Sequence, residues 1–298
     1  MKKPVLSIIE YIGFRLFTCL FRILPFCLCK RLFVAIFIFG GMVLGVRKKV
    51  AYANLSEVYE DKSKKEINTI LKNMYTEMGK TAAETYCTDM DKLFDQVSVE
   101  GWDNLQKAVE MGRGVILATG HLGNWELAGR YISKHFKTAV VIRKQRNRLF
   151  NDYTNKLREK YDIKLIYTKN ALKEMVKAFG EGYIVCLLMD QNAGKRGVLT
   201  DFLGRPASTF VGPAKIAIKY NIPIVPAAAI RTAEGRHLLY FDKIISAEGY
   251  DKSLTGVTAL TQRISNQIEK YIHRYPQQWF WVHRRWRKYH RAREVAEI

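Results

Sequence analysis

The pattern of apolar and polar positions changes near residue 97. Residues 50–95 carry apolar positions at helical spacing among many charges, whereas the chain beyond alternates short apolar runs with amphipathic stretches. We expect strands at 114–120, 138–144, 163–168, 183–190, 222–231 and 237–244, and helices at 124–136, 150–161, 171–182 and 212–221. This alternation predicts an α/β fold with a mostly parallel central sheet flanked by helices.

The first 46 residues are the most apolar part of the chain. Residues 32–46 (LFVAIFIFGGMVLGV) hold no charge, and an earlier apolar stretch at 14–29 is interrupted by two arginines. Because a spanning helix needs about 20 apolar residues, the uncharged run is short for a span. Basic residues at 47–49 follow it, which is unusual for a cleaved signal sequence and favours contact with anionic headgroups.

We therefore expect residues 1–46 to form a membrane-anchoring helix or helical hairpin, which lies in the cytoplasmic leaflet or crosses the membrane once. A buried N-terminal core helix is the alternative. We found no linker or internal repeat after it, so residues 47–298 are expected to form a single α/β domain.

Composition and charge narrow the classes of protein. The chain is 48% hydrophobic and 12% aromatic, which excludes general disorder. Its 49 basic and 28 acidic residues give a net charge of +21, so the surface attracts anions such as nucleic acid, anionic lipid, phosphorylated sugar or an acidic carrier protein. The five cysteines have no regular spacing, which argues against a disulfide framework and for a cytosol-like compartment.

The segment ATGHLGNWELAG at 118–129 is the best candidate for a reactive site. Two histidines have an acid five residues later: His121 with Glu126, and His237 with Asp242. The second pair lies in an expected strand, where side chains five apart point to opposite faces and cannot cooperate. The first pair lies between a buried-strand pattern and an amphipathic helix, where the two side chains can meet at the carboxyl edge of the sheet.

A neutral imidazole can take a proton from a hydroxyl, and a carboxylate on its other nitrogen fixes the tautomer. No serine or cysteine stands beside the pair as a nucleophile, so the acceptor's own hydroxyl would attack. Alternatively, His121 only caps a helix.

Further blocks extend along the chain, and together with GHLGNWE (120–126) they resemble the lipid A biosynthesis (lauroyl/myristoyl) acyltransferase family. The blocks are Ala53-Asn54-Leu55, Arg143 with Asn147 and Arg158, Asp190-Gln191, Thr209 and Gly212, and Trp281, His283 and Arg285. Arg287 stands where this family usually has lysine, which keeps the charge but changes the geometry.

The resemblance implies an O-acyltransferase of the inner membrane that faces the cytoplasm and uses no metal or organic cofactor. The donor would be acyl carrier protein, and the acceptor a hydroxyl of a lipid A precursor in the membrane. His121 would be the general base and Glu126 its orienting partner. Substrate-binding roles fall on Gly123, Asn124, Arg143, Arg158, Asp190, Gln191, Thr209 and Arg285.

Several roles stay open at this point. Asp190 could contact substrate or cap a turn, and Arg143 or a backbone N–H could bind the oxyanion. The basic residues at 283–293 could dock phosphate or the carrier, or form a solvated tail, with Arg285 suited to bidentate phosphate binding. Trp279, Trp281 and Trp286 suit either a membrane interface or a core.

Two other functions compete with the first. The acceptor could be another lipid, such as a lysophospholipid, a phosphatidylinositol mannoside or an aminolipid. The charge and the C-terminal aromatic residues could also indicate an RNA-binding protein. We expect no nucleic-acid partner, because no RNA-binding motif is recognisable and the apolar first 46 residues would be unexplained.

Overall fold

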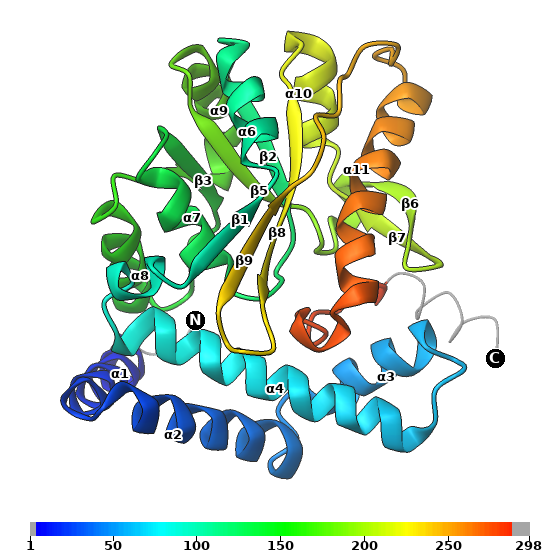
Figure 1. Ribbon diagram of the computed structural model, residues 1–298. Coiled ribbons are helices and arrows are strands. Elements are labelled where there is room, and N and C mark those ends of the chain that lie inside the picture. The colour runs from blue at the N-terminus through cyan, green and yellow to red at the C-terminus, as the bar shows by residue number, and fades with distance from the viewer. Residues whose placement is uncertain (1–3, 288–298) are drawn as a thin grey trace.

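The central sheet contains all six strands expected from the sequence. The computed structural model describes residues 4–287 (Figure 1). The strands are β2 (Val115–Thr119), β3 (Thr138–Ile142), β4 (Lys164–Tyr167), β5 (Ile184–Leu188), β8 (Ile224–Arg231) and β9 (His237–Phe241). A seventh strand, β1 (Val97–Glu100), had no sequence prediction, and the order is β1-β9-β8-β2-β5-β3-β4.

The sheet is mostly parallel, as expected. Only β8 and β9 pair antiparallel, so β1 and β9 run against the other five strands. A separate antiparallel hairpin of β6 (Val198–Phe202) and β7 (Arg205–Thr209) was not predicted. Its turn residues Leu203 and Gly204 both have positive φ, which is the geometry of a tight two-residue hairpin loop.

Helices cover both faces of the sheet, which explains why β2 is apolar without alternation. Val115 and Leu117 pack against α6 (Trp102–Glu110) and α7 (Trp125–Ser133). Ile116 and Ala118 belong to a larger core on the other face. That core includes α9 (Ala171–Gly180), α10 (Gly212–Tyr220) and α11 (Leu254–Arg274).

The long helix α4 (Lys64–Cys87) runs past the carboxyl ends of the parallel strands (Figure 1). It begins with a capping box, in which the Ser63 hydroxyl accepts from the Glu66 N–H and the Glu66 carboxylate accepts from the Ser63 N–H. Two shorter helices flank it, α3 (Lys48–Val58) and α5 (Asp91–Phe94). Ligands of such sheets collect at the carboxyl edge. Because α4 lies along this edge, it forms one wall of the candidate site.

The N-terminal region is a helical hairpin. Helix α1 (Pro4–Ile23) and helix α2 (Phe26–Ile38) are separated by Leu24 and Pro25, and α2 continues into a π-helical turn at Phe39–Val43. Within the described part of the chain, one helical stretch, Phe26–Val43, is long and apolar enough to cross a membrane, and only 17% of it is buried. Large apolar side chains are exposed along both helices, namely Ile8, Ile9, Ile12, Leu16, Leu20, Ile23, Leu28, Leu32, Ile36, Phe39 and Val43.

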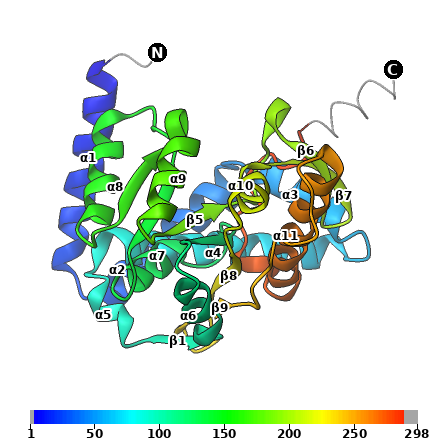
Figure 2. The same ribbon diagram turned by 90° about the horizontal axis from the view of Figure 1, so that it is seen from above.

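The hairpin packs tightly on the rest of the molecule. Phe33 of α2 packs in one buried cluster with Ala83 of α4. Helix α1 lies beside α8 (Arg148–Glu159), where the Phe14 and Phe150 rings meet edge to face at 4.9 Å (Figure 2). The Asn147 side chain also donates to the Ser7 carbonyl at 2.8 Å.

Gly79 lets α4 and α2 touch backbone to backbone. A Cβ at position 79 would lie 2.8 Å from the Val34 Cα and 3.0 Å from the Phe33 carbonyl oxygen. Those are backbone atoms, so they cannot move aside without separating the helices.

Gly79→Leu should therefore lower the free energy of unfolding by about 1–3 kcal/mol, the usual cost of overpacking. Gly129 is the matched control, because it is also helical and a Cβ there meets nothing within 4 Å. Gly129→Ala should raise stability by up to about 1 kcal/mol. Thermal unfolding in detergent compares the two, and an unchanged Tm for Gly79→Leu would contradict the close contact.

Candidate active site

The turn between β2 and α7 carries His121 and has a fixed shape. Gly123 has φ of 55°, and a Cβ there would collide with the Ala229 carbonyl oxygen, so only glycine fits. The Asn124 side chain caps α7 by accepting from the Leu127 N–H at 3.0 Å. The turn therefore holds the His121 imidazole at the carboxyl edge of the sheet.

The carboxylate that holds His121 is Asp190, which follows strand β5. Its Oδ1 lies 2.8 Å from His121 Nδ1, and its Oδ2 accepts from the His121 backbone N–H at 2.7 Å. Trp279 Nε1 also donates to Oδ2 at 2.7 Å. Asp190 is only 2% exposed, so it orients the histidine from inside the protein and does not face substrate.

These contacts shift the pKa of both groups. Burial would raise the pKa of Asp190, but the His121 imidazole and the hydrogen bonds around the carboxylate hold it at about 2. Burial would lower the pKa of His121, but the Asp190 carboxylate, with a smaller effect of Glu126, raises it above 6.5. An ionised Asp190 on Nδ1 fixes the proton there, which leaves Nε2 as the basic nitrogen.

Glu126, the expected orienting partner of His121, does not take that position. Its carboxylate forms a close ion pair with Arg158, whose Nε lies 3.2 Å from Oε2, and Arg130 Nη2 lies at 3.7 Å. Burial would raise the pKa of Glu126, but Arg158 and Arg130 lower it. Glu126 thus stays ionised near the imidazole and acts on it through charge.

Arg285 is placed differently from the expected phosphate contact. It is fully buried, and its Nη1 donates to the carbonyl oxygens of Gln191 at 3.0 Å and Ser208 at 2.6 Å. Its Nη2 donates to the Thr209 hydroxyl at 2.6 Å, and burial lowers the pKa of Arg285 to about 10. Arg285 and Thr209 hold the C-terminal segment against the β6–β7 hairpin.

Other predicted contacts also turn inward. Asn124 is fully buried, with its amide donating to Glu84 Oε2 at 2.8 Å. The three C-terminal tryptophans, Trp279, Trp281 and Trp286, lie in the core at 0–1% exposure. Of the basic cluster 283–293, residues 288–293 lie outside the described part of the chain.

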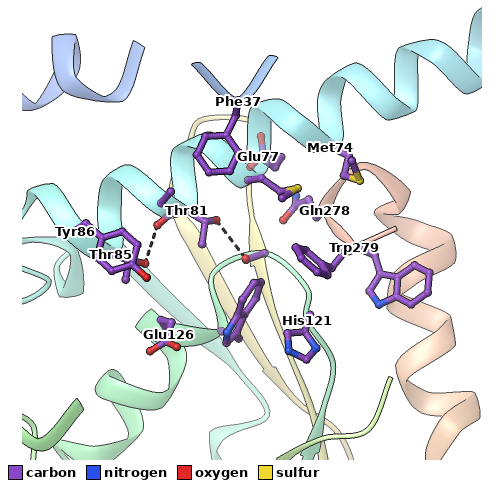
Figure 3. A pocket seen from close by; sticks show the side chains of 15 residues that line it. Phe37, Met74, Glu77, Thr81, Thr85, Tyr86, His121, Glu126, Gln278 and Trp279 are labelled. Atoms are coloured by element: carbon purple, nitrogen blue, oxygen red, sulfur yellow. Dashed lines mark hydrogen bonds between the residues drawn. The ribbon is translucent and has the colours of Figure 1, made fainter. Parts of the chain in front are cut away.

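Two cavities meet at His121. The smaller encloses about 280 Å³ under α4, and the larger encloses about 1040 Å³ over the sheet. Both are lined by Thr85, Tyr86, His121, Trp125 and Glu126. Figure 3 shows the smaller one. Of the predicted binding residues, Gly123 lines the smaller cavity, and Arg143, Arg158 and Gln191 line the larger.

Gln191 lies against the imidazole. Its Nε2 is 3.5 Å from His121 Nδ1 and 3.4 Å from His121 Nε2, so it faces the ring as a whole and not one lone pair. Its side chain also borders the larger cavity. It is therefore a hydrogen-bond donor within reach of a group bound beside Nε2.

Sequence reasoning missed a buried charge network behind the turn. Arg231, at the end of β8, pairs with Glu84 through both Nη atoms and with Glu77 through Nε at 2.8 Å. Glu84 also holds Asn124. The Gln278 side-chain amide accepts from the Arg231 backbone N–H at 2.8 Å and donates to the Arg231 carbonyl at 2.7 Å. The backbone carbonyl of Gln278 accepts from the Gly123 N–H at 3.0 Å.

The same network accounts for the second histidine–acid match. His237 Nε2 lies 3.5 Å from Glu84 Oε2, whereas Asp242 accepts from Lys270 and Tyr271 at 2.9 Å. The two side chains do not meet, as the strand pattern predicted. His237 is a buried member of the network.

A histidine held by a buried carboxylate, where two cavities meet on the carboxyl edge of an α/β sheet, is an arrangement that suits group transfer between two bound substrates. Residues 2–288 match the family model of the bacterial lipid A biosynthesis acyltransferases, and the chain belongs to this family.

Individual relatives differ in their acceptors. The phosphatidylinositol mannoside acyltransferase of Mycolicibacterium smegmatis is 24% identical over 71% of this chain and 69% of that protein. The lipid A biosynthesis palmitoleoyltransferase of Escherichia coli is 26% identical over 81% of this chain and 79% of that protein. The solved 1-acyl-sn-glycerophosphate acyltransferase of Thermotoga maritima aligns with 86% of this chain and 100% of its own, at 13% identity and a TM-score of 0.42.

Replacing Glu84 with alanine should destabilise the fold, because it leaves the buried Arg231 guanidinium and the Asn124 amide without their main acceptor. Removing one partner of a buried ion pair costs about 3–5 kcal/mol. Glu110, which is exposed at the end of α6, is the matched control, and its alanine variant should stay within about 0.5 kcal/mol of wild type. Thermal unfolding decides, and equal Tm values for the two variants would show that the network contributes nothing to stability.

Proposed function

We propose that this chain transfers a fatty acyl group from acyl carrier protein to a hydroxyl of a lipid A precursor at the cytoplasmic face of the inner membrane. The observation that carries the proposal is the His121–Asp190 pair at the junction of two cavities, in a chain of this family. Family membership favours acyl transfer over the RNA-binding alternative.

In the proposed reaction, His121 Nε2 takes the proton of the acceptor hydroxyl as its oxygen attacks the thioester carbon. Asp190 stabilises the imidazolium that forms. Collapse of the tetrahedral intermediate breaks the carbon–sulfur bond, and the imidazolium returns its proton to the leaving thiolate. The products are a new ester and a free carrier thiol, and Glu126 adds a second negative charge beside the imidazolium.

The oxyanion of the intermediate needs hydrogen-bond donors. The backbone N–H groups of His121 and Gly123 already donate, to Asp190 and to the Gln278 carbonyl. Several side-chain donors line the larger cavity, among them Gln191 beside the imidazole and Arg143 after β3. We assign the oxyanion to Gln191, because its amide nitrogen lies 3.4 Å from His121 Nε2.

The charge and the apolar hairpin fit the two substrates. The proposed acceptor is an anionic lipid within a leaflet, and the exposed apolar face of α1 and α2 supports a location there. The donor is an acidic protein that arrives from the cytosol, and a net charge of +21 attracts it.

A second acceptor is favoured by the relatives. A mycobacterial phosphatidylinositol mannoside acyltransferase and an Escherichia coli lipid A acyltransferase are nearly equal in identity to this chain, at 24% and 26%. A mannosylated phosphoglycolipid is therefore the alternative acceptor, with the same base and the same donor thioester.

Membranes that contain the protein, incubated with labelled acyl carrier protein and a tetra-acylated lipid A precursor, should yield a product heavier by one acyl group. His121→Ala should lower the rate by about 10²–10⁴-fold, the usual contribution of a general base. His135→Ala is the matched control at an exposed histidine and should keep full activity. Mass spectrometry follows the product. Acylation of a phosphoglycolipid instead would keep the base and change the acceptor, and no labelled lipid at all would overturn acyl transfer.

Asp190→Asn should change both the rate and its pH dependence. The neutral imidazole is the working form, so activity rises with pH through the pKa of His121, which lies above 6.5. Removing the negative charge that raises this pKa should move the rising limb to lower pH and reduce kcat by about 10²–10⁴-fold. Asp242→Asn is the control and should leave the limb in place. A limb that moves upward or stays in Asp190→Asn would refute the pairing.

A further inference from the structure

The smaller cavity has a lining unlike that of the larger one. Helix α4 contributes Met74, Met78 and Ala82, and helix α2 contributes Phe37, whose ring lies over α4 (Figure 3). No lysine or arginine is among the described residues that line it, and its acidic side chains are Glu77 and Glu126. An anionic head group would not be attracted into this space, whereas an uncharged apolar chain fits it.

The smaller cavity adjoins the surface that suits a bilayer. Phe37 lies between Ile36 and Phe39, which are 46% and 54% exposed, on the helix that is long and apolar enough to cross a membrane. Phe37 thus stands on an exposed apolar helix, and its side chain lines the cavity that also contains the His121 imidazole. A lipid chain that entered beside Phe37 would contact apolar side chains such as Met78 and Ala82 on its way to His121.

The larger cavity has the opposite character at its edge. Arg143, Arg196 and Lys215 are part of its lining, together with apolar core residues such as Met175 and Ile163. Cationic edges attract a donor whose carrier is acidic, while the apolar interior suits its acyl chain.

Resting on the proposed function, we infer that the two substrates enter from different sides. The smaller cavity takes the apolar chain of the membrane lipid that bears the acceptor hydroxyl, and the larger cavity takes the acyl chain of the donor. Met78, Ala82 and Phe37 then determine which acceptor fits. Since both cavities include His121, the hydroxyl and the thioester carbon meet at Nε2 without either chain crossing the other.

A matched pair of filling substitutions tests this assignment. Ala82→Leu adds bulk to the smaller cavity. Gly129→Leu adds bulk to the larger one, at a helical position where a Cβ meets nothing within 4 Å. Initial rates are measured in mixed micelles with acyl carrier protein thioester and the tetra-acylated lipid A precursor, varying each substrate in turn. If the wild type acylates a phosphoglycolipid instead, that lipid replaces the precursor.

Ala82→Leu should raise the KM for the acceptor about tenfold or more and leave the KM for the donor within about twofold. Gly129→Leu should show the reverse. An acceptor with shortened chains should be insensitive to Ala82→Leu, since it no longer fills the cavity. Thermal unfolding checks that both variants fold, and Phe37→Trp fills the smaller cavity from α2 should Ala82→Leu not fold.

The failures are distinguishable. If the wild type works but Ala82→Leu changes only the donor KM, or both variants change both constants alike, the assignment of the cavities is overturned and the acyl transfer stands. If the wild type acylates none of the offered lipids, the proposed function falls and the assignment falls with it.

Discussion

The buried Asp190 carboxylate is the constraint on which the site depends. It accepts from the backbone and the imidazole of His121 and from the Trp279 indole, so it ties the β2–α7 turn to the C-terminal segment. A buried carboxylate is stable only if its oxygens are well satisfied, and here N–H groups from two distant parts of the chain do so. The C-terminal segment therefore completes the site: Phe280 donates to the His121 carbonyl, and Asn54 of α3 holds the carbonyls of Trp281 and His283.

Asp190 and Glu126 act differently on the His121 imidazole because their surroundings differ. Asp190 touches the ring and is held by donors of no net charge apart from the histidine, so its charge is directed at the imidazole. Glu126 is neutralised locally by Arg158 and Arg130, and it influences His121 over a longer distance. The arginines spare the site the repulsion of two unpaired anions, and the Arg158–Glu126 pair also joins α8 to α7.

The strands and the turn that carries His121 could be predicted from the sequence because both are local signals. VILAT, TAVVI and IVCLL are apolar runs of strand length, and Gly120 and Gly123 around His121 indicate a turn. The partner of His121 was predicted wrongly because only the pairing of β2 with β5 brings Asp190 next to it, 69 residues along the chain. The burial of Arg285 and the Glu84–Arg231 pair likewise depend on contacts that are long in sequence. Polar residues of that kind look alike in a sequence whether they face solvent, substrate or core.

The backbone contact at Gly79 joins the hairpin rigidly to the rest of the molecule. Helix α2 touches α4 directly, and Thr81 of α4 donates to the Gly123 carbonyl in the reactive turn at 3.3 Å. With α2 set in a leaflet, the imidazole would lie at a constant depth relative to the lipid carbonyls, because the turn that carries it cannot move independently of α2. Under the proposed function, the acceptor would need to search only the two dimensions of the leaflet, and only a hydroxyl at that depth would meet His121.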